Sequence, residues 1–151
     1  MKTLIKWTLS TLLLCSAVVK ADEGSPELGK YPKVYQTQDY QVTILRIGSK
    51  EAQTYLVKVD GLDNDFDGQI YKHHTLCDNT SCKKYKLETK EIPGTQRWWT
   101  IQTTQSWGGN TGLVMYPPGI EEKQYLYKAE RPKSFEPAAF YQTYLGQITQ
   151  R

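Results

Sequence analysis

The chain has 151 residues, which suits one domain and leaves no room for a second of ordinary size. Its 19 Lys and Arg exceed its 16 Asp and Glu, but Lys2, Lys6 and Lys20 all precede the first acidic residue. Taking these three lysines from the 19 leaves 16 basic groups against 16 acidic ones, so the charge gives no reason to expect nucleic acid as a partner. The 11 Tyr, 4 Trp and 3 Phe exclude a disordered chain, because they supply enough apolar material for a core.

Residues 1–21 have the pattern of a cleaved export signal. Lys2 and Lys6 give a positive start, a mostly apolar stretch follows, and Val19 and Ala21 supply the small residues of a cleavage site. The apolar stretch is shorter than the roughly 18–20 residues of a membrane-spanning helix, so we expect no stable membrane anchor. The sequence therefore predicts cleavage near Ala21 and a mature protein that is periplasmic or secreted from a bacterial cell.

After the signal, residues 22–36 are rich in Gly, Pro and charge and predict a flexible lead-in. A single β-rich domain is expected over residues 37–151. Alternating polar and apolar residues, many of them β-branched or aromatic, predict short strands separated by Gly, Pro and Asn turns. The predicted strands are residues 40–47, 54–59, 69–76, 83–89, 97–104, 112–116 and 123–128.

Only the end of the chain has a helical pattern. Ser134 can cap a helix with Glu136 and Pro137 in its first turn, and Gly146 can end it. About seven strands followed by one short C-terminal helix predict a mainly β (α+β) fold. The expected architecture is a small antiparallel β-sandwich or a partly open β-barrel, with the helix over an edge or open end.

Cys77 and Cys82 are the two cysteines that remain after cleavage. Two cysteines in an oxidising compartment are expected to pair, whereas a metal site would need His73 or His74 as a further ligand. So short a ring stabilises the fold by less than the ~3 kcal/mol of a 15-residue loop, so it shapes a local surface instead. It resembles the disulfide-closed loops that exported inhibitors insert into enzyme clefts.

Five residues in and near this ring are predicted to bind a partner. Asn79 and Thr80 are polar and lie inside the ring, Lys83 and Lys84 flank it, and Trp107 lies in a Gly/Asn loop that suits an exposed aromatic anchor. A rigid ring loses little freedom on binding. The first hypothesis is therefore a non-enzymatic binding protein of the bacterial envelope, of the inhibitor or immunity type. Its partner would be a protein, such as an envelope-acting enzyme or a toxin.

Asp63, Asp65, Asp67 and the carbonyl of Gln69 match the start of an EF-hand-type calcium loop. However, the twelfth loop position is His74 where that loop type has a bidentate Glu, and the preceding residues predict a strand where a helix is needed. A solvated turn between two strands is the alternative. The second hypothesis is therefore a calcium-assisted carbohydrate- or cell-wall-binding module, and the first hypothesis requires no cofactor.

His73 and His74 are the only histidines. Adjacent residues on a strand point to opposite faces, so the two cannot serve one site together. No Gly-x-Ser-x-Gly or His-Glu-x-x-His pattern accompanies them. The sequence therefore predicts no catalytic residue, and an unrecognised periplasmic hydrolase is the third hypothesis.

Charge is uneven along the mature chain, with acidic residues at positions 60–67 and lysines around the cysteine ring. If the strands form hairpins, these two segments lie at different ends of the domain. The resulting dipolar surface would steer a partner of opposite charge. An ordinary solvated surface is the alternative.

Overall fold

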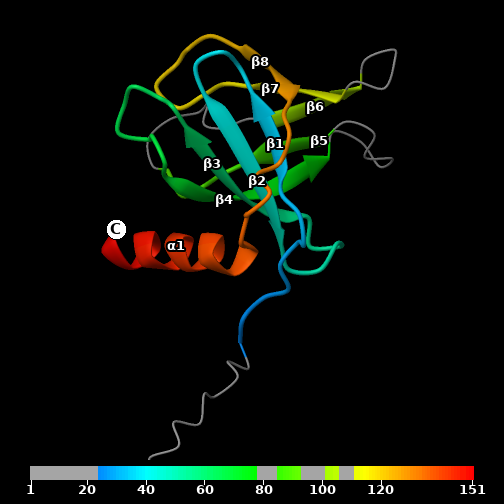
Figure 1. Ribbon diagram of the computed structural model, residues 1–151, viewed down its shortest axis with the longest axis vertical. Helices are drawn as coiled ribbons and strands as arrows, with labels where there is room; N and C mark the ends of the chain where they lie inside the picture. The colour runs from blue at the N-terminus through cyan, green and yellow to red at the C-terminus, as the bar shows by residue number, and fades with distance from the viewer. Residues whose placement is uncertain (1–23, 78–84, 93–100, 106–110) are drawn as a thin grey trace, which may run out of the picture.

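The structure is a computed structural model that describes residues 24–77, 85–92, 101–105 and 111–151. The described residues form eight strands and one C-terminal helix (Figure 1). The elements are β1 (Lys33–Gln36), β2 (Gln41–Ile47), β3 (Thr54–Asp60), β4 (Ile70–Cys77), β5 (Tyr85–Glu88), β6 (Ile101–Gln105), β7 (Thr111–Met115), β8 (Gln124–Lys128) and α1 (Pro137–Gln150). The seven predicted strands correspond to β2–β8, which confirms the mainly β fold with a helix at its end.

The strands form an up-and-down barrel. Each described strand pairs antiparallel with the next one along the chain, and β1 pairs with β8 to close the circle. The closing register joins Tyr35 to Lys128 and Gln36 to Tyr127. The predicted alternative of a β-barrel is therefore observed, but the described strands close it where a partly open barrel was expected, and its strand order follows the sequence.

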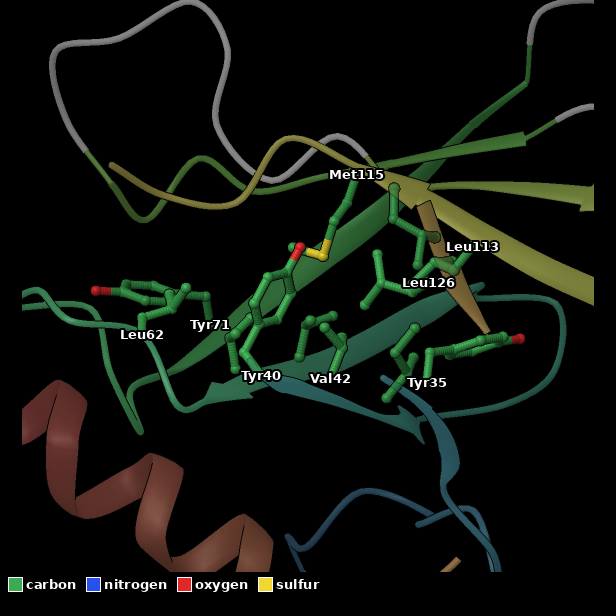
Figure 2. Packing of buried hydrophobic residues seen from close by; sticks show 12 residues of the cluster. Tyr35, Tyr40, Val42, Leu62, Tyr71, Leu113, Met115 and Leu126 are labelled. Atoms are coloured by element: carbon green, nitrogen blue, oxygen red, sulfur yellow. The ribbon is translucent and has the colours of Figure 1, made fainter. Parts of the chain in front are cut away.

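Side chains that alternate along the strands fill the barrel interior. Val42 of β2, Val57 of β3 and Leu113 of β7 are fully buried there, as is Met115. In Figure 2, Val42, Leu113 and Met115 lie in one cluster with the rings of Tyr35 and Tyr40. The full cluster comprises Tyr35, Tyr40, Val42, Ile44, Val57, Val59, Leu62, Tyr71, Leu87, Leu113, Met115 and Leu126.

Helix α1 covers the outer face of β2, β3 and β4. Leu45, Leu56 and Ile70 point outward from these strands and pack with Tyr144 of the helix in a second cluster. The same three strands also contribute to the interior cluster, so they are buried on both faces. In β2 this is seen at Ile44 and Leu45, adjacent apolar residues that are buried on opposite faces.

The carboxylate of Glu91 holds α1 to the barrel wall. The Tyr144 hydroxyl donates to its Oε1 at 2.5 Å, and the backbone N–H of Lys72 donates to its Oε2 at 2.8 Å. The Arg151 guanidinium lies 3.8 Å from the same Oε2. One side chain from the β5–β6 connection therefore joins the helix to β4.

The predicted start of the helix is wrong by a few residues. The helix begins at Pro137, and Glu136 is its N-cap residue without a side-chain capping hydrogen bond. Ser134 therefore does not cap it. Proline has no backbone N–H that a cap would have to satisfy, and its fixed φ suits the first helical position. The helix therefore starts at Pro137 without a polar cap.

The predicted end of the helix is also wrong, because α1 continues past Gly146 to Gln150. Beyond Gly146, the Gln147 side-chain oxygen accepts a hydrogen bond from the backbone N–H of Ile70 at 2.9 Å. The Arg151 guanidinium stacks 4.3 Å from the ring centroid of Tyr71. These contacts with β4 keep the last turn helical where the local sequence favours a stop.

The lead-in predicted for residues 22–36 needs a correction at its end, since residues 33–36 form β1. The residues before it also follow β2: Leu28 forms a bridge with Ile47, and the backbone N–H of Gly29 donates to the Arg46 carbonyl at 2.9 Å. A strand of four residues that follows Pro and Gly is too short to show a clear alternation of polar and apolar residues. Pairing with β2 and β8 holds it in place, so the barrel begins before residue 37.

Candidate functional site

The strand order gives the barrel two ends that carry different connections. Because neighbouring strands are antiparallel, the β1–β2, β3–β4, β5–β6 and β7–β8 connections leave from one end. The β2–β3, β4–β5 and β6–β7 connections and the chain after β8 leave from the other (Figure 1).

The two ends differ in charge. The first, named here the acidic end, carries the described acids Asp39, Asp60, Asp63, Asp65, Asp67, Glu91, Glu121 and Glu122 against the cations Lys90 and Lys123. The second, named the basic end, carries the described cations Lys30, Lys33, Lys50, Lys128, Arg131 and Lys133 against the acids Glu27, Glu51, Glu130 and Glu136. The prediction that the acidic segment and the cysteine ring attach at different ends is confirmed for the strand ends that flank them.

The predicted partner-binding residues attach at the basic end. Cys77 ends β4 and is the register partner of Tyr85, the first residue of β5. Gln105 ends β6 and is paired with Thr111, the first residue of β7. The topology therefore brings together the ends of the two segments that carry these residues. The segments themselves lie outside the described residues, with Asn79, Thr80, Cys82, Lys83, Lys84 and Trp107 among them.

A groove at the basic end was not predicted from the sequence. It has a volume of about 680 Å³ and lies between the start of β1 and the end of β8. The backbone N–H of Ala129 donates to the Val34 carbonyl at 2.9 Å and continues the β1–β8 pairing there. Three cations and one anion are among the lining residues, which are Tyr31, Pro32, Lys33, Val34, Lys128, Ala129, Glu130 and Arg131.

Two cations hold Tyr31 at one wall of this groove. The Arg131 guanidinium lies 4.0 Å from the ring centroid of Tyr31, and Lys30 Nζ lies 5.2 Å from it. Such contacts are worth about 0.5–1 kcal/mol each at exposed sites. The ring is still 55% exposed, so an aromatic face and positive charge are presented together.

The outer face of β8 presents two more tyrosines, Tyr125 and Tyr127, which are 63% and 76% exposed. Leu126 between them points into the barrel and is 1% exposed. Lys123 Nζ lies 5.4 Å from the Tyr125 ring centroid. These two rings are named here the tyrosine stripe.

At the acidic end, Asp67 is part of the loop's own framework. Its Oδ1 accepts hydrogen bonds from the backbone N–H groups of Gly61 at 2.6 Å and Leu62 at 3.0 Å. Gly61 has φ of +103°, and a Cβ there would lie 2.6 Å from the Asp39 carbonyl oxygen. Glycine is therefore required at the turn that Asp67 holds.

The calcium hypothesis has a direct test. Asp63 and Asp65 are exposed and Gln69 is half-buried, and within the described ranges no three His, Cys, Asp or Glu side chains are grouped to hold a metal ion. Because Asp67 already binds backbone N–H groups, we expect millimolar calcium to leave the melting temperature unchanged. A clear rise that Asp65→Ala abolishes and Asp39→Ala preserves would support the second hypothesis.

His73 and His74 point to opposite faces of β4, as the sequence predicts. His73 is fully buried, and its Nδ1 lies 3.0 Å from the Tyr71 carbonyl oxygen. A carbonyl only accepts, so Nδ1 carries the proton. Burial lowers the pKa of His73 to about 3, an effect that the hydrogen bond opposes and the neighbouring His74 increases. His73 is therefore a neutral core residue, while His74 is exposed.

No family model matches the chain, and no curated protein or solved structure matches it. In the described part of the chain, no helix is both long and apolar enough to cross a membrane. The groove and the tyrosine stripe were not predicted from the sequence, although the alternation in residues 123–128 places Tyr125 and Tyr127 on the side opposite Leu126.

Proposed function

We propose that the chain is an exported, non-enzymatic binding protein of the bacterial envelope, of the inhibitor or immunity type. Its partner is a protein, which it binds with the basic end of the barrel. The supporting observation is the strand order, which attaches residues 78–84 and 106–110 at one end together with the described cations. A closed barrel is a rigid scaffold, and loops on rigid scaffolds commonly carry binding function.

The charge of the two ends favours an acidic surface on the partner. Cations such as Lys50 and Lys33 lie at the end that carries Lys83 and Lys84 in the sequence, while the aspartates lie at the opposite end. An acidic partner is attracted to the first end and repelled by the second, so it approaches in the productive orientation.

The proposal includes export with removal of residues 1–21 and a Cys77–Cys82 disulfide. The closed ring would hold Asn79 and Thr80 in place before the partner arrives, which reduces the entropy lost on binding. Because Asn79 and Thr80 are polar and lie inside a short ring, we expect neither side chain to contribute to a core. Changes in the ring should therefore affect binding more than stability.

The test starts with a pull-down from periplasmic extract and continues with binding kinetics on the captured partner. Asn79→Ala with Thr80→Ala should weaken binding about 10-fold with an unchanged melting temperature. Lys83→Glu with Lys84→Glu should chiefly slow association, and more so at low salt. Trp107→Ala should speed dissociation.

Asp63→Asn with Asp65→Asn, at the acidic end, is the matched control and should leave binding unchanged. Intact mass of the starting protein should show Asp22 as its first residue and no alkylatable thiol. Partner binding that survives the three changes at the basic end would place the interface elsewhere and contradict the proposal.

A further inference from the structure

The tyrosine stripe has no role in the barrel core. Tyr125 and Tyr127 stand on the same side of β8, about 7 Å apart along the strand, and are largely exposed. Their flat faces are apolar while their hydroxyl groups remain hydrated. Rings presented in this way suit ligands that combine an apolar face with a polar rim, and a sugar ring with its C–H face and hydroxyl edge is such a ligand.

The stripe leads directly into the groove at the basic end. Positions 125, 127 and 129 share one side of the chain because side chains alternate along an extended strand. Ala129 pairs with Val34, and both line the groove. A chain-like ligand lying along the outer face of β8 would therefore pass over the two tyrosines and enter the groove.

Positive charge along this path is concentrated at the groove. Lys33, Lys128 and Arg131 line the groove at one end, against the single anion Glu130. Lys123 lies over the Tyr125 ring at the other end. Glu121 and Glu122 precede Lys123, so the groove end of the path is the part that favours a negatively charged group.

An acidic peptide or a nucleic acid fits these features less well. A peptide that adds to a sheet needs a free strand edge, and the described strands form a closed circle without one. Nucleic acid needs many neutralised phosphates, but the cations here are few and the opposite end is acidic. Two exposed tyrosine rings beside a cationic groove favour an acidic glycan.

We propose that the tyrosine stripe and the β1–β8 groove bind an acidic glycan, meaning an oligosaccharide or polysaccharide whose sugar rings carry carboxylates. The tyrosine rings stack on sugar rings, and the groove cations bind the carboxylates. This site goes beyond the proposed protein binding and uses neither the cysteine ring nor Trp107. In the envelope it would retain the protein on an acidic polysaccharide.

The test uses three matched probes with the full mature protein in titration calorimetry. Hexagalacturonate supplies sugar rings and charge, its full methyl ester supplies the rings without charge, and hexaglutamate supplies the charge without rings. We expect hexagalacturonate to bind about 10-fold or more tightly than either control probe. Its affinity should fall as salt is raised.

Two double variants separate the stacking from the charge. Tyr125→Ala with Tyr127→Ala should weaken hexagalacturonate binding about 10-fold and keep its salt dependence, whereas Lys128→Gln with Arg131→Gln should weaken binding and reduce the salt dependence. All four side chains are exposed, so the melting temperature should not change. Ile148→Ala and Lys90→Gln, exposed residues elsewhere, are the controls and should bind as the unchanged protein does.

Equal binding of hexaglutamate would overturn the proposal in favour of an acidic peptide. Failure of hexagalacturonate to bind at millimolar concentration, or binding unaffected by both double variants, would also overturn it. Retained binding of the protein partner in the Tyr125→Ala, Tyr127→Ala variant would show that the two proposed functions are independent.

Discussion

Replacing Tyr144 by Ala is expected to lower the free energy of unfolding by about 3–5 kcal/mol, the range for a large buried aromatic side chain. Tyr144 is only 4% exposed and packs on Leu45, Leu56 and Ile70 of the barrel wall. Removing the ring leaves a cavity between the helix and the sheet. Urea unfolding at neutral pH gives the change, and an unchanged m-value would show that unfolding still exposes the same surface.

The hydroxyl group of Tyr144 makes a separate contribution. Burial and the hydrogen bond to Glu91 raise the pKa of Tyr144, so the hydroxyl remains a donor over the ordinary pH range. Tyr144→Phe keeps the ring and removes this bond to a charged acceptor, which should cost about 1.5–3 kcal/mol. Glu91 would still accept from the Lys72 backbone N–H and lie near Arg151.

Tyr127→Ala is the matched control, because it removes the same ring from an exposed position. It should change the unfolding free energy by no more than about 0.5 kcal/mol. If Tyr144→Ala were as mild as this control, α1 could not be docked on β2–β4 as the structure has it.

Local alternation predicted the positions of the strands, but it did not always predict which face of a strand is buried. In β8, Leu126 alternates with Tyr125 and Tyr127, and the pattern alone identifies the inward residue. In β2, five of seven residues are buried, so the alternation is lost. The outward residues there are covered by α1, and that contact depends on the tertiary fold.

The closure of the barrel could not be predicted because it depends on β1. Val34 and Tyr35 favour a strand, but β1 has only four residues and follows Pro32 and Gly29, so the local pattern is too short to identify. Its pairing with β8 joins residues far apart in the chain, such as Tyr35 and Lys128, which local sequence cannot indicate. The groove was missed for the same reason, since residues 31–34 and 128–131 meet only when β1 pairs with β8.

His73 is expected to make the barrel acid-sensitive. In the unfolded chain a histidine has a pKa near 6.5, whereas burial lowers the pKa of folded His73 to about 3. Between these values the unfolded state binds a proton that the folded state does not. Stability is therefore fully retained above about pH 6.5 and is lost as the pH falls toward 3.

The expected size follows from the linkage relation. Between about pH 7 and about pH 4.5, His73 alone should account for a loss of about 2–3 kcal/mol in unfolding free energy. That is a large fraction of the 5–15 kcal/mol that typically stabilises a domain. Chemical denaturation at a series of pH values measures this loss. Carboxylates also contribute to the pH dependence, equally in the unchanged protein and in a His73 variant.

His73→Gln separates the histidine from these carboxylates, because glutamine is a polar residue of similar size that does not titrate. Its unfolding free energy should fall less steeply with acid, by the amount assigned to His73, even if its stability at neutral pH is lower. His74→Gln, which changes the exposed neighbour, should keep the steep loss. If His73→Gln is too unstable to measure, the His73 imidazole signal in NMR decides the matter: a signal that titrates near pH 6 in the folded protein would mean that the ring is hydrated and that the interior of the barrel admits water beside β4.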